Sequence, residues 1–143
     1  MSYGPITLDH IGIAAPDLEA ATPFWNLLGL AQGTHDETVE DQGVVTRFFS
    51  TDEQQSRHPA RIELLEPTGP DTPIGRFLER RGAGVQQVCF RVGDLEGLIQ
   101  HLMDHGVRMI DEVPRQGAGG MRIAFVHPKS TGGVLVELAS KDD

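Results

Sequence analysis

Four side chains capable of metal binding or acid–base chemistry stand at repeated positions in this 143-residue chain: His10, Glu63, Gln87 and Glu137. Gln87 follows His10 at a sequence offset of 77 (87 − 10), and Glu137 follows Glu63 at an offset of 74 (137 − 63). Alternation along each strand predicts that all four lie opposite the apolar residues that pack under a helix. Because duplicated modules usually pack with pseudo-two-fold symmetry, we expect the matched residues to meet near one axis.

The residue types at these positions are suited to one divalent cation. Two carboxylates buried together repel each other, and a bound cation removes that cost. The imidazole and the amide add neutral donors, so the set suits Co, Ni, Mn, Fe or Zn. Taken singly, His10 and Gln87 could be hydrogen-bonded core groups, and Glu63 and Glu137 could be half-exposed strand residues. The matched spacing of all four favours a shared metal site.

The repeat extends to the elements that must position these groups. Asp17-Leu18-Glu19 and Asp94-Leu95-Glu96 are helix starts with an aspartate cap, and the offset between them is again 77 (94 − 17). Each half therefore predicts strand, helix, strand, strand, strand. The strands are expected at residues 8–14, 32–39, 44–50 and 61–66, then at 85–92, 107–110, 122–127 and 134–139.

Local signals add detail to this pattern. Leu18, Ala21, Trp25 and Leu28 follow helical spacing, while Pro23 predicts a distorted first turn or a late start of the helix. Ile74, Phe77 and Leu78 predict a short connecting helix that ends at Gly82-Ala83-Gly84. Residues 51–59 and 115–121 predict loops. We expect an α+β fold in a single domain, 1–143, with modules of about 6–67 and 85–140.

Composition limits the possible partners and compartments. The formal net charge of −9 argues against a nucleic-acid surface, which needs a basic footprint. No apolar run is long enough to span a bilayer, and the first residues do not read as a signal peptide. The single cysteine, Cys89, fits a reducing cytoplasm. We therefore expect a cytoplasmic protein with no membrane or nucleic-acid partner.

Several motifs carry a family resemblance: LDHIGIA at 8–14, IELLEP at 62–67, DTPI at 71–74 and AFVHPKSTGGVLVEL at 124–138. Over nearly its whole length the chain resembles the vicinal oxygen chelate (glyoxalase/bleomycin resistance/dioxygenase) superfamily and, within it, the methylmalonyl-CoA epimerases. The resemblance implies paired βαβββ modules forming a cupped mixed sheet around one metal, usually in a homodimer. It also implies a CoA thioester substrate, interconverted between its (R) and (S) forms through a metal-stabilised enolate.

Two positions depart from the epimerase pattern. The family motif usually has two histidines where this chain has Gln86-Gln87, so Gln87 would replace a histidine ligand. Some epimerases have a glutamate base where this chain has Thr46, which cannot act as a base at neutral pH. We therefore expect Glu137 to be one catalytic acid–base group and Glu63, or a bound water, to be the other.

Other polar groups are candidates for substrate binding. Thr46 could orient a substrate or a water, and Arg91 could bind a substrate carboxylate or be a solvated rim charge. Lys129 and Ser130 could hold a CoA phosphate or thioester tail, or only connect two strands.

Two other functions fit parts of the same pattern. A glyoxalase-like lyase acting on a hemithioacetal would use the same four ligands. A metal-free small-molecule binding protein of the same fold would not need two carboxylates in its cup.

Overall fold

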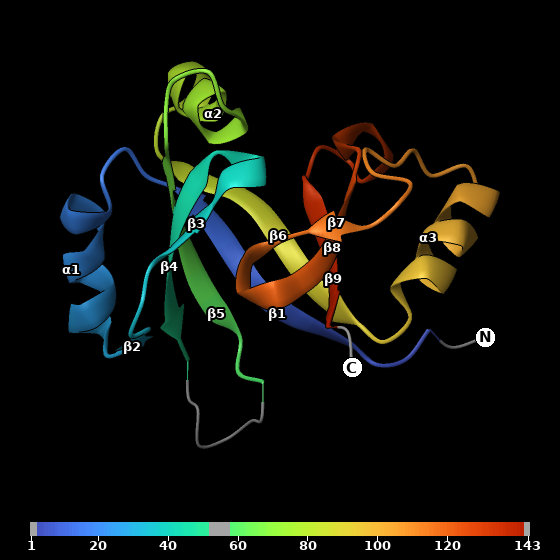
Figure 1. Cartoon of the computed structure of the whole chain (residues 1–143), viewed down its shortest axis with the longest axis horizontal. Helices are drawn as coiled ribbons and strands as arrows, with labels where there is room; N and C mark the ends of the chain where they lie inside the picture. The colour runs from blue at the N-terminus through green and yellow to red at the C-terminus, as the bar shows by residue number, and fades with distance from the viewer. Residues whose placement is uncertain (1–2, 52–57, 142–143) are drawn as a thin grey trace. The chain divides into compact units, whose positions relative to one another are not determined.

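The computed structural model describes residues 3–51 and 58–141, and its elements are labelled in Figure 1. The chain divides into two compact units. One unit is Asp9–Gln86, and the other joins the first residues, up to Leu8, to Gln87 and the rest of the chain. Most of the loop predicted at 51–59, namely residues 52–57, lies outside the described residues.

The first unit contains a mixed sheet with one covering helix. Strand order is β2-β4-β5-β1, with β3 also paired to β4; β1 and β5 are parallel and the other pairs are antiparallel. The elements are β1 (Ile6–Ala14), α1 (Leu18–Leu28), β2 (Ala31–Gln32), β3 (Glu37–Val39), the 3-10 turn η1 (Glu40–Gln42), β4 (Val44–Ser50) and β5 (Arg61–Pro67). The strand predicted at 32–39 is thus two short strands with a break between them.

Helix α1 begins where its cap predicts. The Asp17 side chain accepts a hydrogen bond from the Glu19 amide, and the helix starts at once at Leu18, so the predicted late start is wrong. Pro23 lies inside the helix, where it cannot donate to the Glu19 carbonyl. Leu28 is exposed, contrary to the predicted stripe, because the helix ends at Gly29 in the left-handed conformation.

The core of the first unit lies between α1 and one face of β4 and β5. Leu18, Phe49 and Leu64 are buried there, with Ile13 and Ile62 packed against them. Because side chains alternate along a strand, His10 and Glu63 lie on the opposite face of the sheet. The predicted division of faces is confirmed for this unit.

The second unit repeats the arrangement. Strand order is β6-β9-β8-β7, with β6 parallel to β9 and the other two pairs antiparallel. The connecting helix α2 (Pro73–Arg81) still belongs to the first unit. The elements after it are β6 (Gly84–Val92), α3 (Leu95–Asp104), β7 (Arg115–Gln116), η2 (Ala118–Gly120), β8 (Met121–Val126), η3 (Pro128–Ser130) and β9 (Val136–Lys141). The α+β class and the two βαβββ modules are confirmed.

The middle of this unit differs from the prediction. Residues 107–110 form no named strand and make only one isolated bridge, between Met109 and Val126. The second strand of the module is instead Arg115–Gln116, which pairs with β8 inside the segment predicted to be a loop. The amides of Ile110 and Asp111 both donate to the Phe125 carbonyl, so the chain turns away before a ladder can form.

The two faces of the second sheet have separate cores. Val92, Leu95 and Leu138 are buried under α3, whereas Cys89 and Ile123 are buried on the other face. Gln87 alternates with the α3-facing residues of β6 and so lies on the Cys89 face. In the part of the chain that the structure describes, no helix is long and apolar enough to cross a membrane.

Candidate active site

The first unit brings His10 and Glu63 together. His10 Nε2 lies 3.1 Å from Glu63 Oε1, and their side chains are only 8% and 4% exposed. Parallel pairing of β1 with β5 puts Gly12 beside Glu63, and antiparallel pairing with β4 puts Phe48 on its other side. Gly12 has no side chain to cover the carboxylate.

The second unit brings Gln87 and Glu137 together in the same way. Gln87 Nε2 donates to Glu137 Oε1 at 3.1 Å, and both residues are buried. Cys89 of β6 pairs with Glu137 on one side, and Phe125 of β8 pairs with it on the other. Each unit therefore contains one buried carboxylate beside one nitrogen-bearing side chain.

The strand register reveals further residues, beyond the four predicted ones, that are related by the sequence repeat. Gly12 and Cys89, the β-strand neighbours of the two glutamates, are related by the same offset of 77 (89 − 12). Phe48 and Phe125, the neighbours on the other side, are also 77 apart (125 − 48). The matched aromatic positions were not recognised in the sequence, although the same offset would have found them.

Two further charged residues surround His10 and were also missed. Asp9 Oδ2 lies 2.7 Å from His10 Nδ1 and accepts a hydrogen bond from Arg61 Nη2 at 2.8 Å. Burial raises the pKa of Asp9, but the hydrogen bond to His10 and the positive charge of Arg61 outweigh this and lower the pKa to about 2. Asp9 is thus a carboxylate at neutral pH. The signal in the sequence was the two-residue spacing of Arg61 and Glu63, which puts both on one strand face.

Thr46 and Arg91 lie on the predicted sheet faces but already have partners. Thr46 is buried and donates to the Glu37 carbonyl at 3.4 Å. Arg91 is half-buried, and its Nη2 lies 3.6 Å from Met121 Sδ. The Thr46–Glu37 contact lies within the first unit, and the Arg91–Met121 contact lies within the second.

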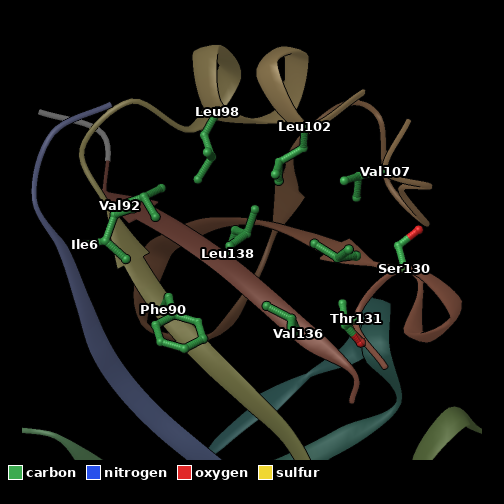
Figure 2. Close-up of a pocket in the computed structure, with 11 residues that line it drawn as sticks. Ile6, Phe90, Val92, Leu98, Leu102, Val107, Ser130, Thr131, Val136 and Leu138 are labelled. Carbon is green, nitrogen blue, oxygen red and sulfur yellow. The ribbon is translucent and has the colours of Figure 1, made fainter. Parts of the chain in front are cut away.

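Lys129 and Ser130 lie in η3, where both are exposed. Ser130 Oγ accepts from the Arg108 amide and lies on the wall of a cavity of about 330 Å³. Figure 2 shows this cavity, whose other walls are apolar side chains of β6, β9 and α3 such as Phe90, Leu98 and Leu138. The cavity lies on the α3 side of the sheet, opposite the face of Gln87 and Glu137. The structure thus separates Ser130 from that pair.

The donors of the two pairs fit a divalent metal. Neighbouring ligands about 2.1 Å from an octahedral ion lie about 3 Å apart, which matches the 3.1 Å separation in both pairs. The ligand atoms would be His10 Nε2, one carboxylate oxygen of each glutamate and the Gln87 amide oxygen, which a half-turn of the amide exchanges with its nitrogen. The carboxylate of each pair would supply one negative charge toward such an ion.

Comparison with known proteins identifies the class of protein. The sequence model of the glyoxalase/bleomycin resistance protein/dioxygenase superfamily matches residues 9–125. The chain therefore belongs to this superfamily.

Individual relatives narrow the class to one kind of enzyme. The chain is 45% identical to the uncharacterized protein YqjC of Bacillus subtilis over 132 residues, covering 92% of this chain and 89% of the relative, and this match does not bear on activity. It is 37% identical to the ethylmalonyl-CoA/methylmalonyl-CoA epimerase of Cereibacter sphaeroides over 134 residues, covering 92% and 95%. The crystal structure of methylmalonyl-CoA epimerase from Mycobacterium tuberculosis matches with a TM-score of 0.88 at 36% identity, covering 100% of this chain and 93% of that one. This chain is accordingly an enzyme of the racemase and epimerase class.

Proposed function

We propose that this enzyme is a metal-dependent epimerase that interconverts the (R) and (S) forms of methylmalonyl-CoA. The observation that carries the proposal is the duplicated pair, a buried glutamate 3.1 Å from His10 in one module and from Gln87 in the other. The named epimerase relatives support the substrate.

Within this proposal, His10, Glu63, Gln87 and Glu137 bind one divalent ion, with Co, Ni, Mn and Zn as candidates. The bound ion would supply the positive charge that stabilises the enolate oxygen formed next to the thioester.

The two glutamates are the proposed acid–base pair. Epimerisation removes a proton from one face of the α-carbon and returns one to the other face. We assign Glu137 to one face and Glu63 to the other, because these two carboxylates occupy matched positions and Thr46 has no basic group. Burial keeps both carboxylates out of bulk water, which strengthens their interactions with the reacting groups.

The proposal extends to the partners of the enzyme. We propose that Arg91 binds the substrate carboxylate, that Lys129 and Ser130 hold a CoA phosphate or the thioester tail, and that Thr46 orients a water or the substrate. We also propose a homodimer with no nucleic-acid or membrane partner. A cytoplasmic location is supported by Cys89, the single cysteine of the chain, which is buried and has no second cysteine to form an intrachain disulfide with.

The decisive measurement is α-proton–deuterium exchange of each methylmalonyl-CoA enantiomer with metal-defined protein. Glu137→Gln should abolish exchange of the enantiomer whose α-proton faces Glu137 while the protein stays folded, because an amide keeps the shape but cannot accept the proton. Glu63→Gln should abolish exchange of the other enantiomer only, because each base serves one face; loss of exchange of both enantiomers together with the metal would make Glu63 a ligand only. If the wild-type protein exchanges neither enantiomer but isomerises a hemithioacetal, the epimerase proposal is wrong and the lyase alternative replaces it.

Metal content tests the other half of the proposal. The purified protein should hold about one divalent ion per chain, and His10→Ala should lose most of it. Equal metal content in the two proteins would contradict the assignment of His10 as a ligand.

A further inference from the structure

The imidazole of His10 is held from the side opposite Glu63. Its Nδ1 lies 2.7 Å from Asp9 Oδ2, and its Nε2 lies 3.1 Å from Glu63 Oε1. Arg61, the direct β5 partner of His10, donates from Nη2 to the same Asp9 oxygen at 2.8 Å. The three residues therefore form a line of contacts, Arg61 to Asp9 to His10, that ends at the nitrogen facing Glu63.

Phe48 contacts both Arg61 and His10, the first and last residues of this line of contacts. The Arg61 guanidinium lies 4.1 Å from the centre of the Phe48 ring, a cation–π distance. The His10 ring meets the same phenylalanine edge-on, with ring centres 5.6 Å apart. Arg61 and His10 thus share one aromatic support, which limits how far either side chain can turn.

The second module shows that the fold does not need this arrangement. With the repeat offsets, Asp9 corresponds to Gln86 (86 − 9 is 77) and Arg61 corresponds to Leu135 (135 − 61 is 74). The same β-α-β-β-β unit therefore forms without the carboxylate and without the guanidinium. The pair occurs only in the module whose donor is an imidazole.

The difference between the donors explains this asymmetry. An imidazole has two ring nitrogens, and the group bonded to one of them decides whether the other can bind a metal. The amide of Gln87 has a single good ligand atom and needs no such partner.

We propose that Asp9 and Arg61 are positioning residues that fix His10 with Nδ1 hydrogen-bonded and Nε2 presented to the metal. This inference rests on the metal site proposed above. Asp9 accepts a hydrogen bond from the Nδ1–H group, which holds the ring orientation and makes Nε2 a stronger metal ligand. Arg61 acts one step further away, by holding the Asp9 carboxylate in place.

The test is the affinity of the metal-free full-length protein for Zn²⁺ and Co²⁺, measured by competition with a chelator. Asp9→Asn should weaken binding by about 10–100-fold, the usual loss for such a partner of a metal-binding histidine. Arg61→Leu, which installs the residue type of the second module, should weaken binding less. The double variant should bind no more weakly than Asp9→Asn alone, because both residues act through the same carboxylate.

A control and a spectroscopic readout separate positioning from general stability. Gln86→Asn, at the matched position of the other module, should change the affinity by less than about twofold, as expected for a residue that contacts no ligand. In the Zn²⁺-loaded protein, the His10 Nδ1–H should give a slowly exchanging NMR signal in the wild type and lose it in Asp9→Asn. If Asp9→Asn does not fold, Arg61→Leu gives the same test through weaker binding and faster exchange of that signal.

Two different results would refute the positioning role of Asp9 and the proposed metal site. If His10→Ala loses metal while Asp9→Asn binds within twofold of the wild type, the positioning role is refuted and the metal site stands. If His10→Ala binds as well as the wild type, the metal site itself is wrong.

Discussion

Arg47 offers a test of how the first module is held together. It lies on β4 and faces α1, where its guanidinium donates to Asp36 through both Nε and Nη2, at 2.8 and 2.7 Å. Nη2 also donates to Glu19 at 2.9 Å and Nη1 to the Thr22 hydroxyl at 2.8 Å, so the guanidinium joins the helix to the sheet. Arg47→Met removes these contacts but keeps an unbranched apolar side chain.

The expected loss follows from the exposure of the partners. Glu19 is 82% exposed, so its bond contributes at most about 1 kcal/mol. Asp36 is 35% exposed and bonded at two points, so this pair dominates at about 1–2 kcal/mol. Both carboxylates regain water in the variant, and no charge is left buried without a partner. Arg47→Met should therefore lower the free energy of unfolding by about 1–3 kcal/mol.

Urea unfolding of the two proteins measures this difference. Arg76→Met is the control, because the Arg76–Asp71 pair is equally short but exposed, and its loss should cost less than about 0.5 kcal/mol. Hydrogen bonds from Arg47 lower the pKa of Asp36, so this stabilisation is complete above the unfolded-state pKa of about 4 and is lost as pH falls through the folded-state value. The difference between wild type and Arg47→Met should thus shrink below about pH 4. Equal stability of the two proteins at neutral pH would refute the reasoning, since desolvation of the guanidinium would then cancel its bonds.

Three further variants test the site and the fold. Gln87→His should keep or raise the metal affinity in a chelator competition, because imidazole binds borderline metals more strongly than an amide oxygen; a large loss would place residue 87 outside the ligands. Thr46→Ala should leave the rate of α-proton exchange within about threefold, because the hydroxyl already donates to the Glu37 carbonyl; loss of exchange would make Thr46 part of the chemistry. Gly75→Ala should destabilise the protein by about 1–3 kcal/mol in urea unfolding, because the new Cβ would lie 2.6 Å from the carbonyl oxygens of Gly69 and Pro70; unchanged stability would show that this turn can move.

Strong periodicity made the strands and caps of this chain predictable. The strand at Val44–Ser50 was predicted with its observed bounds, and Asp17 and Asp94 cap α1 and α3 as expected. The internal repeat was equally readable, because duplicated modules need the same residue types at the same places in the ladder. It singled out His10, Glu63, Gln87 and Glu137, and the structure shows these four residues buried as two pairs, His10 beside Glu63 and Gln87 beside Glu137.

Features that depend on contacts between distant segments were not predictable. The apolar pattern at 107–110 is that of a strand, yet the Phe125 carbonyl accepts two successive amides there and ends the pairing. The spacing of Arg61 and Glu63 puts both on one strand face, but nothing in the sequence near Arg61 indicates its partner Asp9, which lies 52 residues earlier in the chain. Its role follows only from the parallel register of β1 and β5.

The two modules differ in a way that fits the proposed chemistry. Both keep the carboxylate, Glu63 or Glu137, and both keep the phenylalanine beside it. They differ at the donor, where one has His10 with Asp9 and Arg61 around it and the other has Gln87. Exchange of either carboxylate for a neutral group would leave a divalent ion with one compensating negative charge fewer in a buried site, which is costly. The neutral donor can be exchanged, because imidazole and amide carry the same charge. Divergence between the modules is therefore expected at positions 10 and 87 and not at 63 and 137.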